Sequence, residues 1–335
     1  MAGYSEYIPS LSRVCPEYIP SLYRTREGLR INSGKTENIL RLNWPWTMDH
    51  GPSTFFLSPK HPNIAPMQAA PDLHFCVLIP VYNNPEGLLR SLRTINYPSE
   101  HHLVVVVDDG SREPITPDLW ENASLSSPIH LIRLPRNKGI TATLNAGLEW
   151  ITAHTSARYV ARLDCGDTCH PDRFRAQVAY MDAHPAVGLL GTWCTFSTPD
   201  GTVSYRYTTP LHHEAIEKEL HLRNVFIHPT VMLRTALLQT TGFYPYDYPH
   251  AEDYALFWAL IKVSRGAILD RFLVTCEISP RGLSLGNRQA QLKSRWGVVR
   301  HFGNNQTMKL LGFIKTKLFL FVPQRLILWL KKAKA

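Results

Sequence analysis

The sequence predicts an α/β protein with a mostly parallel sheet flanked by helices and a basic, helical C-terminal tail. From residue 74 onward, short apolar runs typical of buried strands alternate with segments of helical periodicity. Polar and acidic residues follow several of these runs, at the edge where parallel sheets bind their ligands. The tail, 309–335, contains seven Lys and Arg residues and no acid.

The first half of the pattern alternates regularly, as expected for a doubly wound sheet. Strands are expected at 74–82, 103–109, 129–135 and 158–164. Helices are expected at 84–95, 140–154 and 170–184. Pro85 supports the first of these helices, because proline is favoured in a first helical turn.

The second half is more mixed. Strands are expected at 187–197 and 201–207, joined by a turn at 199–201, and an apolar strand region at 224–234. Helices are expected at 212–222 and 252–263. The last of them begins with Glu252 and Asp253, and acids are stabilising at a helix N-terminus.

Composition narrows the class of protein. The 335 residues, 44% of them hydrophobic, are enough for one large domain or two smaller ones with a real core. The net charge of +9 lies mostly in the tail, which argues against a general nucleic-acid-binding protein. Six dispersed cysteines without a C-x-x-C pair are typical of a reduced, cytoplasmic protein. No signal peptide is expected, because the first residues contain no apolar h-region, and no membrane span is expected, because no apolar run approaches 18 residues.

Residues 1–70 differ from the rest of the chain. The hexapeptide EYIPSL occurs at 6–11 and again at 17–22, and no sustained periodicity follows. Two short copies do not make a repeat fold. We expect a poorly ordered extension or an added appendage here, with a small docking element as the alternative.

Two aspartates, Asp164 and Asp167, follow the fourth expected strand with the spacing D-x-x-D. Divalent ions such as Mg²⁺ and Mn²⁺ take one or two carboxylates together with phosphate oxygens, so a metal-diphosphate site is one interpretation. The alternative is that these acids cap the next turn and helix. A zinc site at Cys165, Cys169 and His170 is disfavoured because the spacing is not that of structural zinc.

Six motifs in this order resemble the nucleotide-sugar glycosyltransferases of family 2, which have the Rossmann-like GT-A fold. They are VLIPVYNNPEGLLRSLRTI (77–95), VVVVDDGS (104–111), RNKGITATLNAGLEW (136–150), YVARLDCGDTCHPDRF (159–174), HPTVMLR (228–234) and HAEDYALFWAL (250–260). The resemblance covers 74–283. It implies a GT-A domain at 71–283, with a nucleotide-binding half at 71–185 and an acceptor half at 186–283, followed by a helical segment at 284–335.

The resemblance also implies a donor pocket. Its base and ribose part would be lined by Pro80, Val81, Tyr82 and Asn83, with the Tyr82 ring available for stacking; strand-end packing is the alternative for these four. Asp109 would bond to the base or ribose. Lys138 and Gly139 would lie beside the nucleotide, although Lys138 also fits a solvated surface lysine.

For the diphosphate end, the resemblance implies that Asp164 contacts the ribose or a metal-bound diphosphate and that Asp167 holds Mn²⁺ or Mg²⁺. Gly166 stands where the family usually has a third acid. With no acid at this position, Asp167 is expected to be the main metal ligand and Asp164 the supporting one.

For the acceptor end, the resemblance implies that Asp253 is the catalytic base, with Glu252 as the second candidate. A pair of acids that only stabilises a helix N-terminus is the alternative. His228 is expected on the acceptor side or in a structural role. In "QLKSRW", Gln291 is one residue too far from Arg295 for the motif of processive relatives, so we expect single additions.

These features predict an inverting hexosyl- or deoxyhexosyltransferase that acts on a glycan or lipid-linked acceptor, in bacterial polysaccharide or lipopolysaccharide synthesis. A degenerate, non-catalytic binding module is the alternative, supported by Gly166. A nucleotidyltransferase ranks lower because no Gly-rich phosphate loop follows the first strand. The tail at 309–335 is expected to hold the protein on an anionic, cytoplasmic membrane surface, or else to pack on the core. No nucleic-acid partner is expected.

Overall fold

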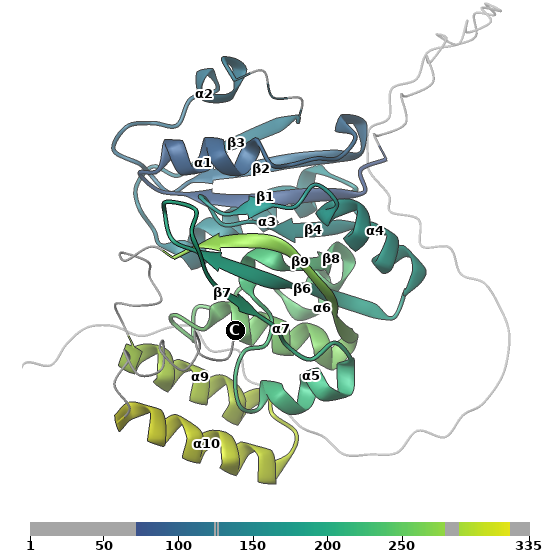
Figure 1. The fold of residues 1–335 in the computed structure, drawn as a ribbon, viewed down its shortest axis with the longest axis vertical. Coiled ribbons are helices and arrows are strands. Elements are labelled where there is room, and N and C mark those ends of the chain that lie inside the picture. Colours follow the sequence, from purple (N-terminus) through teal and green to yellow (C-terminus); the bar gives the residue numbers. More distant parts are fainter. Residues whose placement is uncertain (1–71, 124, 126, 279–287, 322–335) are drawn as a thin grey trace, which may run out of the picture. The chain divides into compact units, whose positions relative to one another are not determined.

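A sheet of nine strands forms the centre of this computed structural model, which describes residues 72–123, 125, 127–278 and 288–321 (Figure 1). All of these belong to one compact unit, Ala65–Ala335. The prediction for residues 1–70 lies outside the described residues, as do 322–335 of the tail. The strands are β1 (Phe75–Val81), β2 (His102–Asp108), β3 (Ile129–Arg133), β4 (Tyr159–Arg162), β5 (Thr168–Cys169), β6 (Val187–Ser197), β7 (Val203–Tyr207), β8 (Met232–Arg234) and β9 (Arg265–Glu277).

The strand order confirms the α/β class and its mostly parallel core. The order is β3-β2-β1-β4-β8-β6-β9-β5, with β7 paired to β6. Strands β1 to β4 pair in parallel with one another in the order β3-β2-β1-β4, and β6 pairs in parallel with β9. Strand β8 runs antiparallel to both β4 and β6 and so joins the two halves of the sheet.

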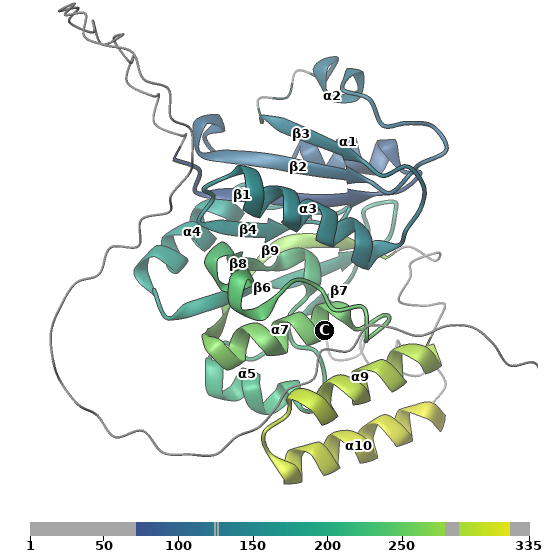
Figure 2. The same ribbon diagram turned by 180° about the vertical axis from the view of Figure 1, so that it is seen from behind.

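The helices cover both faces of the sheet. They are α1 (Pro85–Leu92), α2 (Asp118–Glu121), α3 (Ile140–His154), α4 (Arg173–Ala183), α5 (His213–Leu220), α6 (Leu238–Thr241), α7 (Glu252–Val263), α9 (Arg288–Phe302) and α10 (Gln306–Phe321). Figures 1 and 2 show α1 and α3 on opposite faces of the β1–β4 region. Residues of β1 therefore alternate between two cores: Leu78 packs in the same core as Leu144 of α3, and Val77 packs in the same core as Leu88 of α1.

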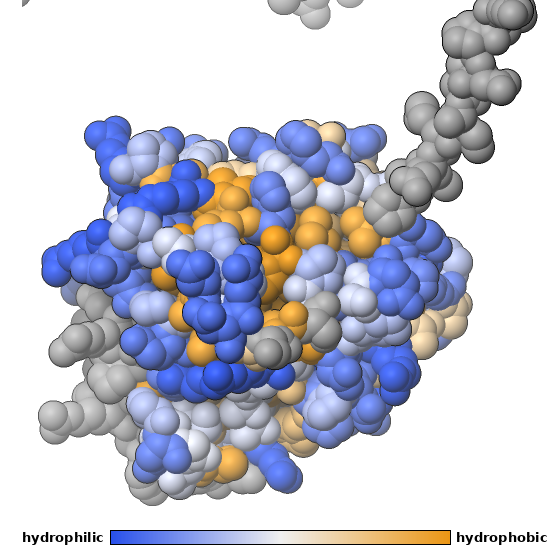
Figure 3. Space-filling view, turned by 90° about the horizontal axis from the view of Figure 1, so that it is seen from above, coloured by the Kyte–Doolittle hydropathy of each residue, from blue (hydrophilic) through white to orange (hydrophobic). Residues whose placement is uncertain are grey.

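The edge strand β3 is less enclosed than β1. Four of its five residues are half-buried, and its paired neighbour is β2. Figure 3, which views the molecule from above, shows hydrophobic side chains framed by hydrophilic ones on this side. β3 is therefore an edge strand, whereas β1 lies inside the sheet between β2 and β4.

Two segments differ from the sequence prediction. The apolar region 224–234 contains only a 3₁₀ turn, His228–Thr230, and the short strand β8, because Pro229 removes a ladder donor. Strand β9 was not predicted, since Asp270 and Arg271 interrupt its apolar pattern. It nevertheless pairs with β6 along most of its length.

The C-terminal helices confirm the predicted helical tail as far as residue 321. Helix α9 packs on the body of the protein through Val298 and Val299, which are buried in the core beside α7. The turn after it is held by Asn304, whose backbone amide donates to His221 Nε2 at 3.3 Å. Within 72–321, apart from the undescribed gaps, no helix is long and apolar enough to cross a membrane.

Candidate active site

The loops after β1 and β2 are joined by hydrogen bonds. The Asn83 backbone amide donates to Ser111 Oγ at 2.8 Å, and Asn83 Oδ1 accepts from the Arg112 amide at 2.9 Å. Asn83 has φ of 51°, a conformation that asparagine tolerates better than most residues. Tyr82, just before it, exposes 46% of its surface, while Pro80 and Val81 are buried in the strand. Of the four residues predicted to line the base pocket, Tyr82 therefore offers a free aromatic face.

Asp109 connects the end of β2 with the start of α3. Its Oδ1 accepts from the Lys138 amide at 2.7 Å, and its Oδ2 accepts from the Gly139 amide at 3.0 Å. Gly139 has φ of 85°, which a residue with a side chain rarely adopts. The structure thus brings together three residues predicted for the donor pocket, although their contact with a nucleotide remains a prediction.

The D-x-x-D loop is held against α1 by Ser91, which the sequence analysis missed. Ser91 Oγ accepts from the Gly166 amide at 2.9 Å and donates to the Asp167 carbonyl at 2.7 Å. Gly166 has φ of 104°, so the turn requires glycine or strain. The only signal for Ser91 was a small polar residue on the apolar face of a helix.

The two aspartates of this loop lie in different environments. The Asp164 side chain is 43% exposed and forms an ion pair with the buried Arg162. Asp167 is only 6% exposed, and its Oδ1 accepts from the Glu277 amide at 2.9 Å. Burial, assisted by the charge of Asp164, raises the pKa of Asp167 to about 8. Asp167 therefore holds its proton more tightly than an exposed aspartate does, whereas Asp164 faces solvent.

The different environments of Asp164 and Asp167 affect how each could bind the predicted Mn²⁺ or Mg²⁺. In the described part of the chain, no group of three or more His, Cys, Asp or Glu side chains is placed to hold a metal ion by itself. The half-exposed Asp164 fits a cation shared with a diphosphate, and its supporting role stays a prediction. Asp167 is directed to the β9 backbone, so its role as main ligand also stays a prediction.

The cysteines of this region have other partners. The Cys165 thiol donates to the Asn84 carbonyl at 3.3 Å, and burial raises its pKa to about 12. Cys169 Sγ accepts from Arg173 at 3.2 Å. A thiol with so high a pKa is a poor ligand and nucleophile, so Cys165 fills space in a tight loop.

Arg162 links the donor side to His228. Its Nε donates to His228 Nε2 at 3.2 Å, and the Tyr244 hydroxyl lies 2.8 Å from the same nitrogen. Burial and the Arg162 charge lower the pKa of His228 well below its usual range. Because Nε2 accepts a bond from a cation, His228 is neutral and cannot act as a proton donor through this nitrogen.

Asp253 and Glu252 begin helix α7. Asp253 Oδ2 accepts from Asn224 Nδ2 at 2.9 Å, and its Oδ1 accepts from the Tyr254 amide at 2.7 Å. Burial, followed by the charge of Glu252, raises the pKa of Asp253 to about 7. Glu252 is 8% exposed, and its Oε2 has no hydrogen-bond partner among the described residues.

The acids of the two halves act on one another. The charge of Asp164 contributes to the raised pKa of both Glu252 and Asp253. It also acts on Tyr244, together with both acids of α7. The acids of two motifs separated by almost ninety residues in the chain therefore meet, with Tyr244, in one electrostatic environment at the carboxyl end of β4.

Comparison with known proteins assigns this arrangement to a family. The model of "Glycosyl transferase family 2" matches residues 76–241. The amylovoran biosynthesis glycosyltransferase AmsE of Erwinia amylovora is 31% identical over 198 residues, which are 56% of this chain and 70% of that protein. This chain belongs to glycosyltransferase family 2.

Other relatives agree with the family and the fold. An uncharacterized glycosyltransferase of Haemophilus influenzae is 29% identical over 239 residues, 68% of this chain and 85% of that protein. The crystal structure of S. aureus TarS 1-349 in complex with UDP-GlcNAc superimposes with a TM-score of 0.58 at 18% identity, over 76% of this chain and 77% of that one. At this identity the match supports the GT-A fold alone. Family membership removes the nucleotidyltransferase alternative.

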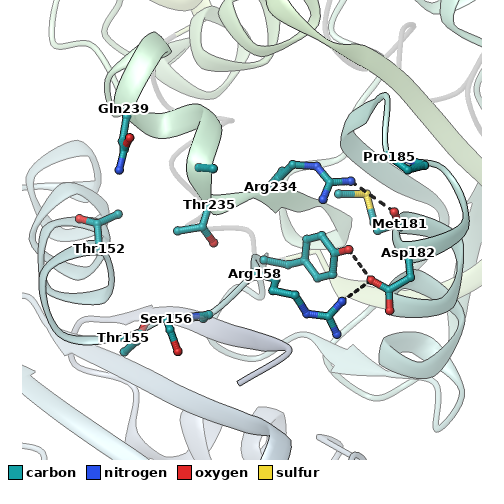
Figure 4. A pocket seen from close by; sticks show the side chains of 13 residues that line it. Thr152, Thr155, Ser156, Arg158, Met181, Asp182, Pro185, Arg234, Thr235 and Gln239 are labelled. Atoms are coloured by element: carbon teal, nitrogen blue, oxygen red, sulfur yellow. Dashed lines mark hydrogen bonds and ion pairs between the residues drawn. The ribbon is translucent and has the colours of Figure 1, made fainter. Parts of the chain in front are cut away.

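A cleft of about 510 Å³ lies away from this family 2 site (Figure 4). It is found at the amino end of β4, whereas ligands of such sheets bind at the carboxyl ends. Two of its charged side chains pair with each other: Asp182 Oδ1 accepts from both Arg158 and the Tyr159 hydroxyl at 2.5 Å, while Arg234 donates to backbone carbonyls. The size of this cleft therefore does not identify it as the donor pocket.

Proposed function

We propose that this family 2 enzyme transfers a hexosyl or deoxyhexosyl group from a nucleotide-sugar donor to a hydroxyl group, with inversion at the anomeric carbon. The observation that carries the proposal is Asp253, a half-buried carboxylate with a pKa of about 7 in the electrostatic field of Asp164. A base is most effective when its pKa lies near the working pH, because it is then both available and strong.

The reaction follows from this placement. Asp253 takes the proton of the acceptor hydroxyl as its oxygen attacks the anomeric carbon. The bond from that carbon to the diphosphate oxygen breaks on the opposite face, and the diphosphate leaves with the electron pair. A divalent cation, Mn²⁺ or Mg²⁺, where bound beside Asp164, would offset the charge of the leaving group.

The donor would lie across the carboxyl ends of β1, β2 and β4. Tyr82 is available to stack on the base, and the loop closed by Asp109 provides backbone next to the ribose. The acceptor would approach from the side of α7. His228, held neutral between Arg162 and Tyr244, would shape this end without exchanging protons.

We assign the acceptor to the glycan or lipid-linked class of bacterial surface polysaccharide synthesis. The support is the relative AmsE, whose name places it in amylovoran biosynthesis. In this role the protein would work in the cytoplasm, on the inner face of the membrane that holds a lipid-linked acceptor.

Helices α9 and α10 support attachment to that surface. Residues 288–321 contain seven Lys and Arg residues and no acid. Four apolar residues of α10 are exposed, between 45% and 61% of their surface: Leu310, Leu311, Ile314 and Leu318. Basic helices with an exposed apolar face bind anionic interfaces through both features.

Two experiments test the proposal. Donor turnover is measured as nucleotide release from UDP-, GDP- and dTDP-sugars, with and without Mn²⁺; no release by folded protein would favour the non-catalytic module. Attachment is measured by sedimentation with anionic vesicles. Leu310→Ser combined with Leu311→Ser should weaken it, whereas the control Val203→Ser, at an equally exposed site on β7, should not.

A further inference from the structure

The two side-chain atoms nearest to a Cβ added at Gly166 both belong to hydrogen-bond donors. A Cβ atom at this position would lie 3.7 Å from Arg90 Nη2 and 3.9 Å from Asn84 Nδ2. This is the position at which the family's metal motif usually has its third acid. Here the chain has no carboxylate, and a guanidinium from α1 occupies the surroundings instead.

Arg90 is positioned but not enclosed. Its Nη2 donates to Glu277 Oε2 at 2.7 Å, and 49% of its side chain is exposed. A guanidinium has five N–H donors in a planar fork, so a single bond to Glu277 leaves several donors available. The same Glu277 donates its backbone amide to Asp167, which ties Arg90 to the D-x-x-D loop.

The surroundings of Arg90 are hollow and polar. A cleft of about 280 Å³ is bounded by α1, the D-x-x-D loop, the β6–β7 turn and the end of β9. Hydroxyl side chains contribute to its wall, among them Thr168, Thr198 and Thr275. Guanidinium and hydroxyl groups are the usual partners of phosphate oxygens.

We propose that Arg90 binds the diphosphate of the nucleotide-sugar donor at Gly166, which gives the enzyme an affinity for nucleoside diphosphates that does not depend on a divalent cation. The inference rests on the proposed function, because it takes the donor to be a nucleotide sugar. Glu277 holds the guanidinium in place before the donor arrives and competes with the phosphate for it.

The test is calorimetric titration of the full chain with UDP, GDP and dTDP, each compared with its free nucleoside, in EDTA and in Mn²⁺. The diphosphate with the highest affinity for wild type is used for the comparison. In EDTA, Arg90→Gln should bind it about tenfold more weakly than wild type does, while the affinity for the corresponding nucleoside should not change. Arg93→Gln, an exposed arginine at the end of the same helix, is the matched control and should behave as wild type. Glu277→Gln should bind at least as tightly as wild type, because the competing carboxylate is gone.

Several outcomes would overturn the inference. Equal affinity of wild type and Arg90→Gln in EDTA would do so, as would binding that requires Mn²⁺ whether or not Arg90 is present. Loss of Mn²⁺-supported binding in Glu277→Gln would instead make Glu277 a cation ligand. If Arg90→Gln melts early, Arg90→Lys keeps the charge without the fork and should bind with intermediate affinity. A folded wild type that binds none of the three diphosphates would remove the proposed function itself.

Discussion

Replacing Asp253 by asparagine should remove most sugar transfer and at the same time stabilise the folded protein at alkaline pH. The catalytic effect follows from the loss of the base. A positioned general base contributes about a hundredfold or more to the rate, which corresponds to at least ~2.7 kcal/mol of activation free energy. We therefore expect kcat of Asp253→Asn to fall about a hundredfold, with little change in donor KM.

The wild-type pH profile should carry the same signature. The pKa of Asp253 is raised from 3.8 to about 7, mainly by burial. About one tenth of the side chains are ionised one pH unit below the pKa and about nine tenths one unit above it. Transfer should therefore rise nearly tenfold between pH 6 and pH 8, and this rise should be absent from the residual activity of Asp253→Asn.

The stability effect has the opposite sign. A carboxyl whose pKa is raised on folding binds its proton more tightly in the folded state, so it costs stability as pH rises from about 3.8 to about 7. Asparagine removes this cost but places an amide N–H opposite either Asn224 or the Tyr254 amide, which costs about 1 kcal/mol at every pH. The stability of Asp253→Asn relative to wild type should thus increase from pH 5 to pH 8.

Glu252→Gln is the matched control. Glu252 is a buried neighbour whose pKa is also raised by burial, so its replacement should produce a similar trend in stability. It should not abolish transfer. Urea denaturation and initial rates of nucleotide release are measured on the same preparations. The reasoning fails if Asp253→Asn keeps full transfer, or if Glu252→Gln is the variant that loses it.

Three further predictions concern the donor side. Ser91→Ala should lower the free energy of unfolding by about 1–3 kcal/mol, since it leaves the buried Gly166 amide without its acceptor; an unchanged urea midpoint would contradict this. Gly166→Ala should cost about 1–3 kcal/mol through backbone strain alone, because no atom lies within 3.4 Å of the added methyl group, and a thermal shift measures it. Asp109→Asn should weaken the binding of nucleoside diphosphates about tenfold, because it weakens the hydrogen bond that holds the loop at Lys138. Calorimetry measures this affinity, and a wild-type value would show that the loop is not part of the donor pocket.

The elements that could be predicted from the sequence are those with a clear local pattern of apolar residues. Helix α3 and helix α7 begin and end at the predicted residues, and β6 does so as well. Their apolar periodicity is uninterrupted, so pattern and tertiary packing agree. Strand β9 was missed because its central Asp270 and Arg271 break the pattern, and its pairing with β6 overrides that local signal.

The candidate site was predictable in location but not in detail. Strand order predicted Asp109 and Asp164 at one edge of the sheet, and the family resemblance added Asp253; the charge of Asp164 contributes to the raised pKa of Asp253, which agrees with a common site for these two. Sequence spacing could not distinguish Asp164 from Asp167, because both are aspartates in one short loop. The difference between them arises from Glu277, 110 residues further along, whose amide takes up the Asp167 carboxyl.

Contacts between residues far apart in the sequence also determine which charged side chains lie beside Gly166. Read along the chain, a glycine in place of an acid is a loss, and it supported the idea of a degenerate module. In three dimensions, Arg90 of α1 and Glu277 of β9 line the cleft beside this glycine as an ion pair, and the guanidinium has further N–H groups besides the one that bonds to Glu277. The carboxylate that holds this guanidinium belongs to Glu277, whose backbone amide donates to Asp167. If Arg90 binds the diphosphate as proposed, Gly166 marks a change in how the diphosphate is bound, and titration of Arg90→Gln in EDTA distinguishes this from the loss of its binding.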